Sequence, residues 1–273
     1  DNPTGIAIHN GVAYIGTADD GLNRYIIAND TFLGSWVSTG INDVNFAPLA
    51  ILGTNPQVLH MGLPGYGVAR KDLSSGEILI PLTVEPNRPN PSATEILPSN
   101  QVYALEANTG NSGLFIGTSD GAIYWDGNSA SELSRGNSWN LQPAQFFDFA
   151  IDTSSNSASV YAGTNIGVCK YSVSTLAIDD CVNAQDGMPN WGVNAVGING
   201  STIFGGTTNG VGLIDKSSLN VYDTWEAGEE TDNALVVSVG SGLIANPGLL
   251  SIRCSPGYIK IVVLSVISLS KPA

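Results

Sequence analysis

Basic residues are scarce in this chain of 273 residues, which has ten lysines and arginines against 24 aspartates and glutamates. Proteins that hold nucleic acid without regard to its sequence place lysines and arginines on the phosphates. An anionic membrane surface attracts the same residue types. The net charge of −14 therefore argues against nucleic acid and against a membrane surface as partners.

Cysteine and histidine are also rare, with three and two residues in the whole chain. An odd number of cysteines forms no disulfide framework, and no pair of them has the spacing of a zinc site. We therefore predict no metal and no cofactor. Cys169 and Cys181 fit either a bridge across neighbouring strands or two free core thiols, and the sequence leaves both open.

Long apolar runs and helical periodicity are missing as well. The longest nearly uncharged apolar stretch is Ile261–Leu269, whereas a membrane-spanning helix needs roughly 17–25 residues. We expect no membrane insertion and no leader, since the chain opens at Asp1-Asn2-Pro3 as a mature secreted protein or an excised fragment would. Abundant Ser, Thr, Asn and Gly favour an exported protein, extracellular or periplasmic, which we expect to be a monomer.

Glycine, by contrast, is plentiful, with 32 residues, and it recurs within a repeated phrase. The phrase is a ring residue, a small or apolar residue, Gly and usually Thr, followed by a short turn that ends in a second Gly. Its five copies begin at Tyr14, His60, Phe115, Tyr161 and Phe204. A turn that needs positive φ accepts glycine most easily, so we interpret these positions mainly as scaffold.

Each copy stands among four short apolar runs separated by turn residues, which predicts four strands per repeat. Four-stranded units repeated about every 40–50 residues are typical of β-propeller blades. We therefore predict one all-β domain over residues 1–273, a β-propeller of four-stranded antiparallel blades. We expect six blades, five clear and one divergent, at about 5–38, 45–82, 101–134, 146–182, 193–225 and 234–269. Residues 83–100 form a proline-rich inserted loop.

Two junctions between repeats carry a family resemblance. They read Leu97-Pro98-Ser99-Asn100-Gln101-Val102 and Asp186-Gly187-Met188-Pro189-Asn190-Trp191-Gly192-Val193. Each precedes a strand and a Gly-Thr phrase. The pattern resembles the two-component regulator propeller repeat, whose consensus runs Asp-Gly-Leu-Pro, Ser, Asn, any residue, Val, and later Trp-Ile-Gly-Thr. The second copy departs from it, because Gly62-Leu63 replaces Gly-Thr.

The resemblance implies a β-propeller. In that family such repeats commonly form the extracellular or periplasmic sensor part of regulators, often for sugar-derived ligands, and others stand in exported proteins. Nothing in this chain resembles a kinase, a response regulator or a membrane anchor, so a signalling role is not carried over. Some polysaccharide lyases also use propellers, because a fold does not by itself fix a function.

Candidate ligand-binding residues lie at the blade ends and in the turns that share one rim. Exposed tryptophans stack on sugar rings or anchor a partner, and acidic turn residues could join them. We select Trp191, Trp139, Trp225, Asp19, Asp20, Asp120 and Asp186. His60 occupies a ring position of the repeat and His9 precedes a turn, so we interpret both as structural rather than catalytic.

Three functions remain open. The first is a non-catalytic exported propeller that binds a ligand, which could be a carbohydrate, or a protein partner at the rim or central pore. The second is a carbohydrate-active enzyme, a polysaccharide lyase or hydrolase, that uses carboxylates and Tyr near the pore. The third is a structural module of a larger surface protein. We favour the first, because the sequence contains no recognisable catalytic constellation and we assign no catalytic residue.

Overall fold

The computed structural model describes residues 3–17, 21–35, 49–52, 57–63, 65–84, 96–108, 113–134, 143–152, 158–226, 254–255 and 258–259. In these ranges almost every regular element is a β-strand, and the only helical residues form two 3₁₀ turns, η1 (Ile27–Asn29) and η2 (Ala184–Asp186). No helix in the described part of the chain has the length and apolarity needed to cross a bilayer. The predicted all-β class is confirmed.

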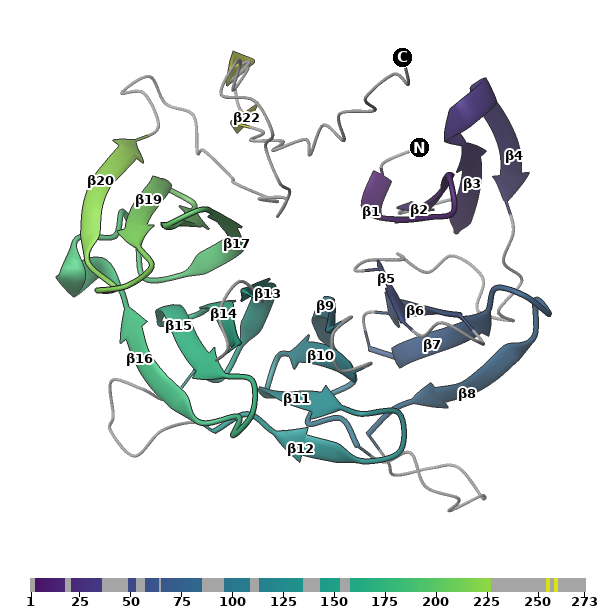
Figure 1. Cartoon of the computed structure of the whole chain (residues 1–273), viewed down its shortest axis with the longest axis horizontal. Helices are drawn as coiled ribbons and strands as arrows, with labels where there is room; N and C mark the ends of the chain where they lie inside the picture. The colour runs from purple at the N-terminus through teal and green to yellow at the C-terminus, as the bar shows by residue number, and fades with distance from the viewer. Residues whose placement is uncertain are drawn as a thin grey trace, which may run out of the picture. The chain divides into compact units, whose positions relative to one another are not determined.

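The chain divides into two compact units, Asp1–Leu133 and Ser134–Ala273. The first unit holds three four-stranded antiparallel sheets, each with its strands in chain order (Figure 1). Their strands are β1 (Pro3–His9), β2 (Val12–Thr17), β3 (Leu22–Ile26) and β4 (Thr31–Ser35); β5 (Leu49–Leu52), β6 (Val58–Leu63), β7 (Gly67–Asp72) and β8 (Ile78–Leu82); and β9 (Val102–Asn108), β10 (Gly113–Thr118), β11 (Gly121–Trp125) and β12 (Ala130–Glu132).

The second unit holds two further sheets of the same design and one short hairpin. Their strands are β13 (Phe146–Asp152), β14 (Ser159–Thr164), β15 (Gly167–Ser172) and β16 (Ile178–Val182); β17 (Val193–Asn199), β18 (Thr202–Thr207), β19 (Gly210–Asp215) and β20 (Val221–Glu226); and β21 (Cys254–Ser255) with β22 (Tyr258–Ile259). The hairpin falls within the predicted sixth repeat. Most of that repeat lies outside the described residues, so the count of six blades and the single domain stay predictions.

Within each unit, the first strands of neighbouring sheets lie against one another, β1 against β5, β5 against β9, and β13 against β17. Apolar side chains of adjacent sheets fill the space between them, as Val182 and Ile203 do in the second unit. Four-stranded antiparallel sheets that pack face to face around their first strands give a propeller-like fold. The five described sheets correspond to the five clear repeats of the sequence.

The Gly-Thr phrase has a direct structural explanation in the turn between the second and third strands. In four sheets the threonine hydroxyl donates to the carbonyl of the second glycine, at 2.8–2.9 Å. In three of them the same oxygen accepts a backbone N–H from within the turn. The second glycine has positive φ in all five sheets, which a side chain would oppose. The scaffold interpretation of these residues is therefore well supported.

The ring position of the repeat is mostly buried. Tyr14, His60, Phe115 and Tyr161 are at most 8% exposed, and Phe204 is half-buried. His60 packs edge-on against Trp125, with ring centroids 5.6 Å apart. Burial and the nearby Arg70 guanidinium lower the pKa of His60 to about 3, although the Val58 backbone acts the other way. His60 is thus a neutral packed ring, as its place in the repeat indicates.

A disulfide bond joins Cys169 to Cys181, which settles the alternative that the sequence leaves open. The two residues lie directly opposite each other on β15 and β16. The link therefore ties the third strand of its sheet to the outer, fourth strand. Cross-strand neighbours in an antiparallel sheet are close enough for such a bond.

Candidate functional site

The junction between β16 and β17 is the most elaborate polar loop in the described part of the second unit. It begins with a capping box, in which Asn183 Oδ1 accepts the Gln185 N–H at 2.8 Å and Asp186 Oδ2 accepts the Asn183 N–H at 3.0 Å. Gly187 then takes the left-handed conformation, with φ of 101°. Reciprocal capping of this kind fixes a short helical turn without any apolar packing of its own. Asp186, one of the predicted residues, therefore has one carboxylate oxygen engaged in capping the turn.

Met188 anchors this junction to the sheet that follows it. The side chain is 4% exposed and belongs to the apolar cluster between the two sheets. It lies over Gly205 and Gly212, and a methyl group added at either glycine would collide with it. The junction is thus seated in a recess that only glycine can leave open. Pro189 lies beside Met188 over the same recess.

Trp191 extends from the end of this anchored loop and is 42% exposed. The preceding Asn190 donates from its side-chain amide to the Thr208 hydroxyl at 2.8 Å, and its carbonyl oxygen accepts the Trp191 N–H at 2.7 Å. Thr208 lies in the turn between β18 and β19, where its hydroxyl also contacts Asn209 at 3.2 Å. An exposed indole beside two amides and a hydroxyl can stack on a flat ring and exchange hydrogen bonds with its substituents.

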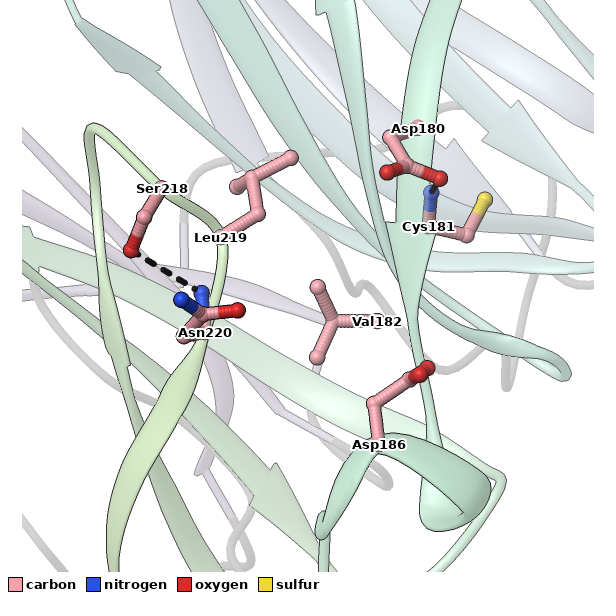
Figure 2. A pocket seen from close by; sticks show the side chains of 7 residues that line it. All are labelled: Asp180, Cys181, Val182, Asp186, Ser218, Leu219 and Asn220. Atoms are coloured by element: carbon pink, nitrogen blue, oxygen red, sulfur yellow. Dashed lines mark hydrogen bonds between the residues drawn. The ribbon is translucent and has the colours of Figure 1, made fainter.

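A pocket of about 380 Å³ lies beside the same junction, between β16 and the turn that joins β19 to β20 (Figure 2). Asp180 and Val182 project toward it from β16, and the sulfur of Cys181 points to the other side, as strand alternation requires. Leu219 reaches toward β16 from the opposite turn (Figure 2). The lining residues are Asp180, Cys181, Val182, Asp186, Ser218, Leu219 and Asn220.

Two further groups near these elements have strongly shifted pKa values. Asp148 on β13 accepts the Val196 N–H of β17 at 2.8 Å, so it links the first strands of two sheets. Loss of water around this half-buried carboxylate raises the pKa of Asp148 to about 7, while the N–H groups of Val196 and Phe149 act in the other direction. Burial, followed by the carboxylates of Asp152 and Asp179, raises the pKa of Tyr161 to about 12. At pH 7 this phenol is protonated and is a weak base.

The structure brings only some of the sequence-predicted residues together. Trp191 and Asp186 share one junction, as described above. Trp225 is half-buried, with its ring 6.1 Å from that of Phe204, and it packs on a cluster of buried apolar residues. Asp120 is exposed in the turn between β10 and β11 of the first unit, where its N–H donates to Thr118 at 3.2 Å. Trp139, Asp19 and Asp20 lie outside the described residues. The binding role of all seven residues stays a prediction.

Sequence reasoning missed several residues of the site. Neither Asp180 nor Ser218 nor Asn220 is among the candidates selected from the sequence. Only the pairing of β16 with β15, and the packing of the two sheets, brings these side chains around one pocket. Asp148 had a signal that could have been found, because a carboxylate stands where Gly5, Ala104 and Ala195 occur in the equivalent strands.

No protein-family model matches the chain, and no curated protein matches it. Solved structures do. The computationally designed Ika8 protein superposes with a TM-score of 0.57 and 14% identity, covering 86% of this chain and 64% of its own length. The extracellular domain of a hybrid two-component system protein from B. thetaiotaomicron gives a TM-score of 0.60 and 15% identity, covering 82% of this chain and 30% of its own. This chain therefore spans less than two thirds of either protein. At such identities the likeness is one of fold.

Proposed function

We propose that this protein is a non-catalytic, exported propeller of the two-component regulator propeller repeat type, and that it binds a carbohydrate at the Trp191 junction. The observation that carries the proposal is the exposed indole of Trp191, held by the Asn190–Thr208 hydrogen bond on a loop that Met188 anchors. Binding residues concentrate on loops held by a rigid scaffold. Tryptophan is enriched among the residues that contribute most to binding at interfaces.

Two features support export and a sensor-like role. The cross-strand disulfide Cys169–Cys181 is of a kind that persists in oxidising compartments. The similar solved structure from B. thetaiotaomicron is itself an extracellular domain of a two-component system protein. Both features favour an exported protein.

The proposal is tested with the full chain on a glycan array, followed by calorimetric titration of any glycan that binds. We expect Trp191→Ala to weaken binding about ten-fold or more, since it removes the stacking surface. Tyr66→Ala is the matched control. Tyr66 is 57% exposed in the turn between β6 and β7 of the first unit, and its backbone N–H, not its ring, donates to the Leu63 carbonyl. Equal loss in both variants, or none in Trp191→Ala, would contradict the proposed site.

The enzymatic alternative has one specific observation in its favour, the carboxyl of Asp148 with a pKa of about 7 on a first strand. A carboxyl that titrates near the working pH can act as a general acid or base. The same glycans are therefore incubated with the protein and examined for new reducing or unsaturated ends. Turnover that Asp148→Asn abolishes would replace the binding-only function with an enzymatic one. If the protein shows neither glycan binding nor turnover, the third function, a structural module of a larger surface protein, is favoured.

A further inference from the structure

We propose that Asn29 and Asn199 are acceptor sites for N-linked oligosaccharides, each at the end of its own sheet opposite to the junctions that connect the sheets. Neither residue belongs to the Trp191 junction. The inference therefore goes beyond the proposed function and shares with it a single premise, that the chain is exported.

Both residues begin an acceptor triplet, in which Asn is followed by any residue except Pro and then by Ser or Thr. The triplets are Asn29-Asp30-Thr31 and Asn199-Gly200-Ser201. Two other triplets, Asn2-Pro3-Thr4 and Asn90-Pro91-Ser92, contain the excluded proline. Because so short a triplet also occurs by chance, its place in the folded chain decides whether it can carry an oligosaccharide.

The two acceptor side chains are exposed and free. Asn29 ends the 3₁₀ turn η1 between β3 and β4, and Asn199 ends β17 at its hairpin with β18. The Thr31 hydroxyl donates to the backbone carbonyl of Asn29 at 3.3 Å and does not engage the side-chain amide. Neither amide makes a hydrogen bond to a residue that the structure describes. A bulky, solubilising oligosaccharide requires such a surface position.

Asparagines in the junctions and in the turns between second and third strands are, by contrast, held by hydrogen bonds. Asn100 Oδ1 accepts a backbone N–H at 2.7 Å, and Asn165 Oδ1 accepts two at 3.0 Å. Asn183 and Asn190 are engaged in the junction before β17. An oligosaccharide on one of these side chains would disrupt a contact that orders its loop. Asn29 and Asn199 differ from them because their amides have no such structural role.

Strand direction places the two acceptors at the same end of their respective sheets. In a four-stranded antiparallel sheet with strands in chain order, the first and third turns lie at one end, and the second turn and the junctions lie at the other. Asn29 is in the third turn of its sheet, and Asn199 is in the first turn of its own. Trp191 lies in the junction before β17. An oligosaccharide on Asn199 would therefore extend from the opposite end of that sheet and leave the indole accessible.

The modification is a group transfer whose donor comes from the export pathway. The donor is an oligosaccharide joined through phosphate to a membrane polyprenol. Asn Nδ2 forms a bond to the anomeric carbon of the first sugar, while the bond from that carbon to the phosphate oxygen breaks. The lipid phosphate leaves with the electron pair, and Nδ2 gives one proton to a base and keeps the other. The hydroxyl two residues further on completes the triplet and is not consumed.

The test is secretion of the full chain, behind a cleavable leader, from eukaryotic cells that carry out this transfer. The mass of the secreted protein is measured before and after peptide N-glycosidase, which removes the oligosaccharide and leaves Asp in place of Asn. We expect one oligosaccharide to be lost in Asn29→Gln, the other in Asn199→Gln, and both in the double variant. Thr31→Ala and Ser201→Ala should cause the same losses with the acceptor intact, whereas Thr31→Ser should retain the modification.

A matched turn provides the control. Asn128 is exposed in the turn between β11 and β12, but the residue two places further on is Ala130, so Asn128→Gln should leave the mass of the attached sugar unchanged. Ala130→Thr completes a triplet in this turn and should add an oligosaccharide at Asn128. A secreted chain with the mass of the bare polypeptide, an unchanged sugar mass in the double variant, or no gain in Ala130→Thr would each overturn the proposal.

The glycan array separates this proposal from the proposed function. Enzymatic removal of the oligosaccharides should leave Trp191-dependent glycan binding unchanged, because Asn199 and Trp191 lie at opposite ends of their sheet. Modification without glycan binding would contradict the proposed function alone. Glycan binding by a chain that is secreted from the same cells without oligosaccharides would contradict the acceptor sites alone.

Discussion

The sheets β5–β8 and β13–β16 place different residues at the same position of the repeat. The ring position holds His60 in one and Tyr161 in the other, each 1% exposed. Burial lowers the pKa of His60 to about 3 and raises the pKa of Tyr161 to about 12. Because burial disfavours the charged form of any group, both rings are neutral over the physiological range. The position thus requires a neutral, bulky ring rather than one residue type.

The same two sheets differ at the turn after the second strand. Thr164 closes one turn with its side chain, through the hydroxyl bond to the Gly167 carbonyl at 2.9 Å. Leu63 has no hydroxyl, and the turn is closed instead by backbone groups, since the Tyr66 N–H donates to the Leu63 carbonyl at 3.0 Å. The buried Leu63 side chain joins the apolar cluster of its unit. The position at the end of the second strand therefore accepts either a polar or an apolar side chain.

The largest expected effect comes from emptying the ring position. Tyr161→Ala should lower the free energy of unfolding by about 4 kcal/mol, because it leaves a cavity in the packed interior. Tyr161→Phe keeps the volume and should cost far less. Urea denaturation followed by circular dichroism measures both. Similar losses in the two variants would mean that the hydroxyl, and not the bulk, is what the position requires.

The disulfide is the next largest difference, since in the described residues only the sheet β13–β16 contains one. Replacing Cys169 and Cys181 together by serine should cost about 3 kcal/mol, because the unfolded chain gains freedom. Urea denaturation of wild-type protein with and without a dithiol reductant provides the comparison. A reductant effect that persists in the double variant would show that another group is responsible.

The two sheets should also respond to pH in opposite directions. The folded pKa of His60 lies below its ordinary value of 6.5, so stability should be lost as pH falls from about 6.5 toward 3. The folded pKa of Asp148 lies above its ordinary value of 3.8, so stability should be lost as pH rises from about 4 toward 7. The upper bound is about 5 kcal/mol for His60 and about 4 kcal/mol for Asp148, and about 2 kcal/mol is expected for Asp148 because its side chain is half-buried.

These opposed slopes are separated by single substitutions. Unfolding free energies measured between pH 3 and pH 7 should depend on pH more steeply in each variant than in the wild type. His60→Phe removes the loss on the acid side and leaves the Asp148 slope, whereas Asp148→Asn leaves the His60 slope. Identical pH profiles for wild type and both variants would contradict the assignment of these two groups.

The smallest expected effect is on the turn between the second and third strands. Thr164→Val keeps the shape of the side chain but removes the hydroxyl, leaving the Ile166 N–H without the acceptor it has at 3.2 Å. We expect a loss of about 1 kcal/mol. Leu63→Ala, by contrast, should act through lost packing and cost more, because that side chain is 1% exposed. Urea denaturation of both variants would reveal whether the two turns really differ in kind.

The fold was predictable because each turn of the repeat requires particular residue types, and these residues recur in the sequence. Glycine at positive φ and threonine at a closed turn recur whatever the rest of a sheet contains, so Gly121 and Thr118 could be recognised without a structure. Asp72, Asp126 and Asp215 likewise mark the outer turns, where each accepts backbone N–H groups at short range. Such local chemistry needs only neighbours in sequence.

The site was less predictable because it depends on contacts between repeats. Trp191 could be singled out, since a tryptophan in a polar junction is unusual in itself. Asp180 and Ser218, however, come together only through the packing of two sheets, and nothing near either residue in sequence indicates the other. The disulfide shows the same limit, because the register of β15 with β16 decides whether the two sulfurs meet.

Met188 packs over Gly205 and Gly212, which belong to the sheet that follows it in the chain. The packing unit therefore begins in the junction before the sheet and not at the first strand. The side chain that fills the recess is encoded before the sheet that provides it, so neither half is complete alone. A fragment cut at the sheet boundary would expose two glycines on one side and an unburied methionine on the other. Duplication or exchange of whole repeats would therefore succeed only when the junction travels with the sheet that follows it.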